Sequence, residues 1–285
     1  MRIISPILPF AAAAAVFAAP ALAQETPPAD SAEPQTQPQS QPARQGSDTA
    51  AEFVTGVEYQ EGDYFTGERV EIVTVQNAAR LRAGSTILSA SLPWHRIEAP
   101  GNVVGGGGPL GLPIFVDPGR PAGRDVREGL GDLRLGLGHT LPSVAGVELT
   151  VTGQVKLPTA SARRGIGTGE TDVAVGAEVA RRFGPVTPYA AIGYTLPGDP
   201  ETFALQNSLS ARGGVALQLG RGLRGNLSYN YAESLRPLAV DEQQISTGLN
   251  ASLSRRLSLG VYGNAGLSEG APDLGAGVSL GFRIF

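Results

Sequence analysis

The chain has 285 residues, of which 41% are hydrophobic and only 17% charged, and its formal net charge is -4. Beyond the N-terminal segment, no apolar run approaches the ~20 residues of a membrane-spanning helix, so the hydrophobicity is dispersed along the chain. The mild negative charge argues against nucleic acid as a partner, and the absence of cysteine excludes a disulfide framework, a thiolate metal site and a lipoprotein anchor.

The first residues have the features of an export signal. Arg2 supplies a minimal positive region, residues 3–20 are apolar and rich in alanine, and small residues at positions 21–23 form a cleavage site. A membrane anchor is the alternative, but prolines interrupt the segment. We therefore predict a signal peptide over residues 1–23. Residues 24–50 are rich in proline and glutamine and are predicted to form a disordered periplasmic tail, because they carry too little apolar bulk to offset their ordering entropy.

Residues 51–285 are predicted to form a barrel, and the pattern is clearest in residues 146–182. Between positions 147 and 157 apolar side chains alternate strictly with polar ones, and after the turn-rich residues 158–169 the alternation resumes to position 182. Period-2 alternation predicts strands with one apolar and one polar face. A strand of about ten residues, tilted ~40°, spans roughly 25 Å, which matches the apolar band of an outer-membrane barrel.

The remaining sequence repeats this unit and predicts about twelve strands. The second is expected over residues 70–78, with a basic turn near Arg80 and Arg82, and the third over residues 86–95; residues 98–129 are the longest irregular segment. Short and long connections alternate, which predicts an antiparallel up-and-down barrel with both termini in the periplasm. A soluble β-sandwich is the alternative, but it accounts less well for the export signal, the strand length and the loop asymmetry together.

Aromatic residues are expected near both rims of the barrel, where membrane proteins carry interfacial girdles. The outer set comprises Tyr59, Trp94, Tyr194, Tyr229 and Tyr231, and the inner set Phe183, Tyr189, Phe282 and Phe285.

Several motifs resemble those of a known family. They are the segments Gly-Leu-Gly-Asp at 129–132, Val-Lys-Leu-Pro-Thr at 155–159 and Gly-Ile-Gly-Thr-Gly at 165–169 followed by Asp172, together with Leu-Pro-Trp at 92–94. In these segments the chain resembles the outer-membrane transporter-like proteins named for the meta-pathway of phenol degradation. The resemblance covers residues 81–194. The resemblance implies a barrel linked to uptake of aromatic or other hydrophobic compounds. One departure is the terminal Phe285, which is one step out of phase with the apolar face of the last strand.

Two groups of residues are candidates for the solute path. Asp132, Lys156 and Asp172 are predicted to point inward near the outer mouth with Arg134 one step below, either as a cross-strand ion-pair set that maintains register or as a substrate site. The long segment 98–129 carries more apolar side chains than an exposed loop normally displays, so these side chains should be buried or should bind a ligand. We expect Ile114, Phe115 and Val116 to form an apolar constriction or entry site. Packing against a neighbouring barrel or external lipid is the alternative for this loop.

The predicted function is a channel or transporter for small molecules in the bacterial outer membrane. A structural, envelope-organising barrel is the alternative. The expected partners are outer-membrane lipid, a small solute and the assembly machinery, without nucleic acid. We predict no enzyme activity, cofactor or metal, because His95 and His139 are far apart and no spacing supports a catalytic triad. The glycines at 165–169 are interpreted as turn residues, since no helix follows them as in a phosphate loop.

Overall fold

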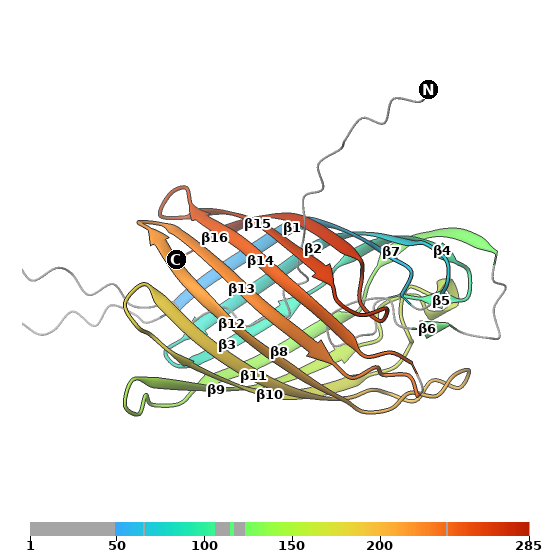
Figure 1. Cartoon of the computed structure of the whole chain (residues 1–285), viewed down its shortest axis with the longest axis horizontal. Helices are drawn as coiled ribbons and strands as arrows, with labels where there is room; N and C mark the ends of the chain where they lie inside the picture. Colours follow the sequence, from blue (N-terminus) through green and yellow to red (C-terminus); the bar gives the residue numbers. More distant parts are fainter. Residues whose placement is uncertain (1–48, 65, 106–114, 117–122, 238, 285) are drawn as a thin grey trace, which may run out of the picture.

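The computed structural model describes residues 49–64, 66–105, 115–116, 123–237 and 239–284. They form a closed antiparallel barrel (Figure 1). In chain order its strands are β1 (Thr49–Gly62), β2 (Val70–Ala83), β3 (Thr86–Ser91), β4 (Trp94–Pro100), β7 (Arg124–Leu130), β8 (Leu133–Thr140), β9 (Val147–Leu157), β10 (Asp172–Arg181), β11 (Val186–Leu196), β12 (Ser208–Gly220), β13 (Leu223–Ala232), β14 (Glu242–Ser252), β15 (Leu257–Gly266) and β16 (Leu274–Arg283). Two short strands, β5 (Val103–Val104) and β6 (Phe115–Val116), pair with each other and do not belong to the barrel wall.

The barrel wall has twelve strands, which confirms the predicted fold. β3 and β4 together make one wall strand, because β2 pairs with both in one unbroken register, Ala78 with Ser91 and Val75 with Trp94. β7 and β8 make another, interrupted at Gly131 and Asp132, where the pairing to β3 and β4 shifts by one residue. Such a bulge bends a strand and redirects the side chains beside it.

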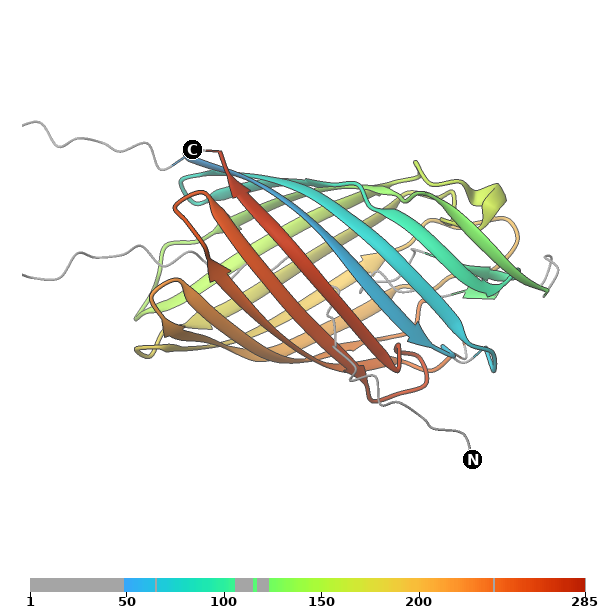
Figure 2. The same cartoon turned by 90° about the horizontal axis from the view of Figure 1, so that it is seen from above.

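Pairing of β1 with both β2 and β16 closes the barrel (Figure 2). At one end the connections are short, as at residues 84–85 and 221–222, whereas the connections at the other end are longer, as at residues 158–171 and 197–207. We call these the turn end and the loop end. Glu52 pairs with Arg283, so the first and last strands have their chain termini at the turn end. In the part of the chain that the structure describes, no helix is long and apolar enough to cross a membrane.

The alternation of the sequence separates an apolar outer face from a mainly polar lumen face. Val57, Val175, Leu249 and Val278 are each exposed on the outside of the wall. All five predicted outer-rim aromatics lie on this outer face, since Trp94 shares it with Val75 and Val57. The hydroxyls of Tyr59, Tyr194, Tyr229 and Tyr231 each have a polar partner. A tyrosine hydroxyl needs such a partner where its ring contacts an apolar environment.

Three local predictions are wrong. Arg80 and Arg82 lie inside β2, which continues to Ala83, and the turn is made by residues 84–85, where Gly84 has a φ of 58°. Residues 98–129 are not irregular throughout, because β4 and β7 pair across the ends of that segment. Tyr189 points into the lumen and therefore does not belong to a lipid-facing girdle at the inner rim. Its ring packs against Gly214, where a Cβ atom would lie 2.7 Å from the tyrosine hydroxyl. Phe285 lies outside the described residues.

Candidate functional site

One half of the lumen is filled by side chains. From β1, β14 and β15, long polar residues point inward and are almost completely buried; they include Glu58, Gln60, Gln244 and Asn264. Amide groups pair two of them with a neighbour: Gln60 Nε2 donates to Glu58 Oε1 at 2.6 Å, and Asn264 Nδ2 donates to Gln244 Oε1 at 2.6 Å. Buried polar groups are costly unless they are paired in this way, so this side acts as a hydrogen-bonded packing layer.

The opposite half of the lumen is hollow. A cavity of about 250 Å³ lies against the inner faces of β8 to β12, where the inward positions are mostly small. The small residues that line it include Gly136, Gly138, Ala174, Gly176, Ala191, Gly193 and Ser210. Thr152 on β9 is exposed although it points inward, because it faces this open space. The distribution of side-chain volume around the wall therefore places the cavity on one side of the lumen.

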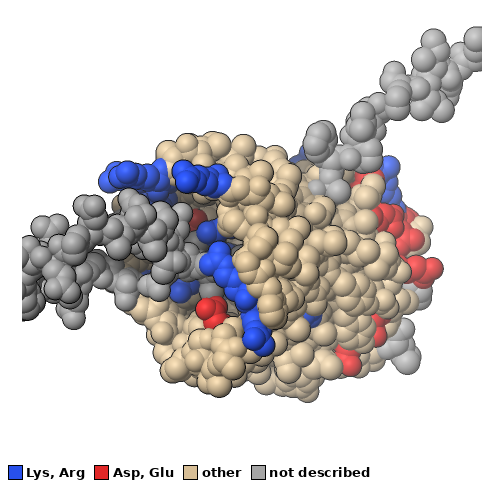
Figure 3. Space-filling model, turned by 60° about the vertical axis from the view of Figure 1, so that its left-hand side comes forward, with Lys and Arg blue, Asp and Glu red and all other residues tan. Residues whose placement is uncertain are grey.

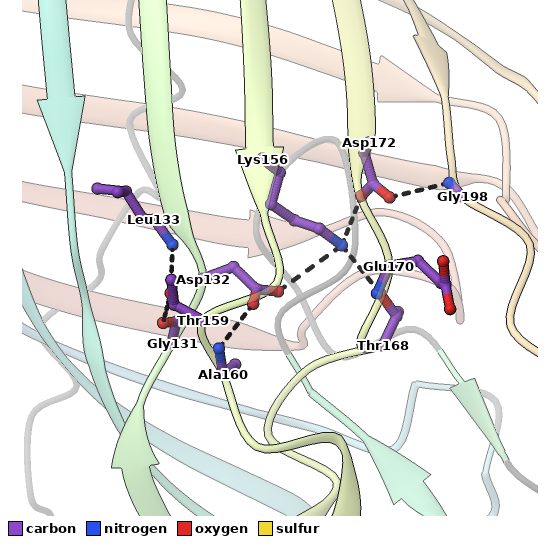
Figure 4. A network of polar contacts seen from close by, with 10 residues as sticks. All are labelled: Gly131, Asp132, Leu133, Lys156, Thr159, Ala160, Thr168, Glu170, Asp172 and Gly198. Atoms are coloured by element: carbon purple, nitrogen blue, oxygen red, sulfur yellow. Dashed lines mark hydrogen bonds and ion pairs between the residues drawn. The ribbon is translucent and has the colours of Figure 1, made fainter.

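Above the cavity, at the loop end, the predicted charged residues come together (Figure 4). Lys156 Nζ lies 2.7 Å from Asp172 Oδ2 and 3.7 Å from Asp132 Oδ2, and it donates to Thr168 Oγ1 at 3.0 Å. We call Asp132, Lys156 and Asp172 the mouth cluster. The pairing register puts Lys156 directly between Arg134 on β8 and Asp172 on β10.

The mouth cluster also binds the loops above it. Asp132 Oδ1 accepts a hydrogen bond from the Ala160 N–H at 2.9 Å, and Asp172 Oδ1 accepts one from the Gly198 N–H at 3.1 Å. Lys156 is only 4% exposed. A buried, hydrogen-bonded ion set of this kind joins strands to loops, so its geometry fits the structural interpretation better than direct contact with a solute in open water.

The loop end of the barrel is crossed by residues 103–105, which we call the strap. Val103 belongs to a buried apolar cluster that links Ile72 of β2 and Ile97 of β4 to Ala232 of β13. In the strand order β13 lies across the barrel from β3 and β4. Val104 packs in a second cluster with Leu235, from the loop after β13. The strap therefore spans the mouth instead of remaining outside the wall.

Polar contacts hold the strap in place. The side chain of Arg127 on β7 is buried, and its guanidinium donates to Val103 O at 2.5 Å and to Pro100 O at 3.2 Å. The Gly105 N–H donates to Gly165 O at 3.0 Å. A buried arginine with backbone carbonyls as acceptors anchors a segment firmly, because the charge would otherwise lose its hydration without compensation.

The sequence analysis did not identify Arg127 as a partner of the strap, or Thr168 and Gly198 as partners of the mouth cluster. Arg127 lies in the segment that was expected to be irregular, and the other two lie in loops whose positions depend on tertiary contacts. Among the predicted apolar residues, Ile114 lies outside the described residues. Phe115 and Val116 form β6, whose backbone pairs with Val104 and Val103 of the strap.

The two histidines lie on opposite faces of the wall. His95 points inward and is buried, with Nδ1 2.9 Å from Thr74 Oγ1, whereas His139 is exposed on the outer face with Nδ1 3.0 Å from Thr86 Oγ1. They cannot share a site. The described residues contain no group of three His, Cys, Asp or Glu side chains placed to hold a metal ion.

No protein-family model and no curated protein matches the sequence. Among solved structures, the chain is similar to an outer membrane channel from Pseudomonas putida F1, with a TM-score of 0.64 and 13% identity over 88% of this chain and 100% of that one. It is also similar to the KdgM porin, with a TM-score of 0.50 and 6% identity over 81% of this chain and 97% of that one. At such identities the similarity concerns the fold, which is that of an outer-membrane barrel.

Proposed function

We propose that the protein is a channel of the bacterial outer membrane that admits small molecules. The single observation that carries this proposal is the cavity of about 250 Å³ inside a wall whose outer face is apolar. Side chains fill the lumen of a barrel that serves only as a scaffold, whereas here the inward residues of five consecutive strands leave room for a solute. In this arrangement the loop end faces the exterior and the turn end faces the periplasm, as in outer-membrane barrels generally.

Aromatic or other hydrophobic solutes are the class that we assign to this channel. Two arguments support that choice: the motif resemblance to the phenol meta-pathway transporter-like family, and the apolar strap across the mouth. Val103 and Val104 present aliphatic side chains where a solute enters, so an apolar molecule would find its first favourable contact there. Movement of the strap would then admit the solute to the cavity beneath.

A structural barrel is the second candidate, and the strap also favours it. The two apolar clusters that contain Val103 and Val104 hold the strap against the loop end of the barrel in this structure. A barrel that stayed closed would contribute to the envelope without passing solutes.

Conductance measurements separate these functions. The purified protein in planar lipid bilayers should pass current, and replacing residues 103–116 by a short glycine linker should raise the conductance and weaken any preference for hydrophobic solutes. Arg127→Met should act in the same direction, because it removes the donor to Val103 O and Pro100 O. The control Arg96→Ala changes an exposed arginine of β4 on the outer face and should leave the conductance unchanged.

Two outcomes would contradict the proposal. Absence of current from both the wild type and the linker variant, with folding verified, would favour the structural barrel. Current that is the same in the wild type and the linker variant would place the strap outside the permeation path.

A further inference from the structure

The lumen face near the turn end carries an excess of arginine. Within the described strands, Arg80 and Arg82 of β2, Arg224 of β13 and Arg283 of β16 point inward there. Arg82 is opposite Ile87, a residue of the cavity wall. Figure 3 shows the lysine and arginine atoms gathered over this end, while most aspartate and glutamate atoms lie toward the loop end.

Few carboxylates oppose these arginines. At the same level the described inward acids are Glu52 and Glu148, and Glu52 is opposite both Arg80 and Arg283 in the register. Arg224 donates to a neutral acceptor, Gln218 Oε1, at 3.1 Å. The ion pairs found among the described residues join Arg69, Arg124 and Lys156 to acids and do not include Arg82, Arg224 or Arg283. This end of the lumen therefore has a surplus of positive charge.

Deeper in the barrel the charges are closer to balance. Cations and anions both line the cavity, but Asp172 is held by Lys156 at 2.7 Å and Glu178 interacts electrostatically with Arg212. Two of the cavity's acids, Asp172 and Glu178, thus each have a cation nearby. A solute that moves from the cavity to the turn end meets an increasingly positive lumen, and low-dielectric walls strengthen that field.

We propose that the channel prefers small carboxylate anions, and in particular amphipathic ones such as aromatic acids. Rings of arginine select anions in pores, and the planar guanidinium matches a carboxylate with two hydrogen bonds. The cavity wall also offers Ile87, Ala174 and Ala191, against which an apolar ring can rest while the carboxylate faces Arg80. This inference rests on the proposed channel function and adds the charge of the solute to it.

The reversal potential of single channels in a KCl gradient tests the preference. The wild type should be anion-selective. Arg82→Gln/Arg283→Gln should lower the ratio of chloride to potassium permeability severalfold, because it removes two inward charges. The matched control Arg181→Gln/Arg255→Gln removes two charges at the same end but outside the lumen, where Arg181 stacks on Phe183 at 5.0 Å, and should leave the ratio nearly unchanged. Heat-modifiable migration on gels verifies that each variant is folded.

Uptake into proteoliposomes supplies a second measurement. Benzoate should enter faster than benzamide, which has the same size without the charge, and the inward double variant should abolish that difference. A wild type that conducts but is unselective or cation-selective overturns the inference and leaves the channel function intact. An equal effect of the inward and control variants, or equal entry of benzoate and benzamide, overturns it as well. Absence of any conductance in the folded wild type would instead contradict the proposed channel function itself.

Discussion

Lys156 shows how one side chain connects three parts of the barrel. It lies on β9, contacts a carboxylate from the bulge before β8 and another from β10, and donates to Thr168 in the loop above. Taking an ammonium group out of water is costly unless its partners are complete, and here two carboxylates and a hydroxyl provide them. The loop after β9 is consequently held to the wall by charge rather than by apolar packing alone.

Lys156→Met should therefore destabilise the barrel strongly. It leaves two buried carboxylates without their cation, a loss that typically costs about 3–5 kcal/mol. Urea unfolding in lipid vesicles measures the change in unfolding free energy. The variant that also carries Asp132→Asn and Asp172→Asn should regain most of the stability. A loss below about 1 kcal/mol for Lys156→Met, typical of exposed pairs, would contradict the buried role of the cluster.

Removing the positive charge also changes the electrostatics of the mouth. If the mouth cluster influences permeation, channels carrying Lys156→Ala should shift toward cation preference relative to the wild type, because two carboxylates then remain without a counter-charge. The reversal potential in a salt gradient measures this shift. An unchanged value would restrict the cluster to a structural role.

At the scale of the element, β9 is the clearest example of a strand with one face on the outside of the barrel and the other toward the lumen. Val151 pairs with His139 and Ala177 on the outer face, and Thr152 pairs with Gly138 and Gly176 toward the cavity. Because successive side chains of a strand point in opposite directions, two adjacent residues experience environments of opposite polarity.

An arginine at each of these two positions should therefore have different effects. Val151→Arg places a charge near the middle of the lipid-facing band and should cost roughly 2–4 kcal/mol, whereas Thr152→Arg extends into the cavity and should be tolerated. Folding efficiency into lipid bilayers and urea midpoints provide the comparison. Equal losses for the two variants would show that the facing of β9 is wrong.

For the whole molecule, closure is the decisive feature. The contact between β1 and β16 involves residues more than 200 positions apart in the chain, and their register runs from Glu52 with Arg283 to Glu61 with Leu274. Closure leaves the N–H and C=O groups of these two strands no free edge inside a membrane, where unsatisfied backbone groups cost several kcal/mol each.

Val57→Pro tests this closure, since β1 pairs on both of its edges and Val57 lies opposite Val278 and Val75. Proline removes a ladder donor and leaves the facing carbonyl unsatisfied inside the membrane, which should cost several kcal/mol. The folded, heat-modifiable form should be reduced or lost. Val57→Ala changes the same outer-face position but keeps the N–H, so it should cost much less. Similar stability of the two variants would mean that β1 is not a doubly paired strand.

The sequence by itself determined which side chains face lipid and which face the lumen. It also determined the number of strands and the convergence of Asp132, Lys156 and Asp172. These properties follow from period-2 alternation and from the order of neighbouring strands in an up-and-down barrel, both of which are local in the chain.

Only the tertiary structure decided how the lumen is filled. The strap reaches Ala232 and Leu235 across the barrel, Arg127 finds its acceptors in Val103 and Pro100, and the cavity lies on one side because large polar residues occupy the other. The extension of β2 through Arg82 was likewise decided by pairing with β1 and β3, which continues beyond the point where the apolar alternation weakens. Alternation along one strand contains no information about these contacts, since each depends on side chains that only closure of the barrel brings together.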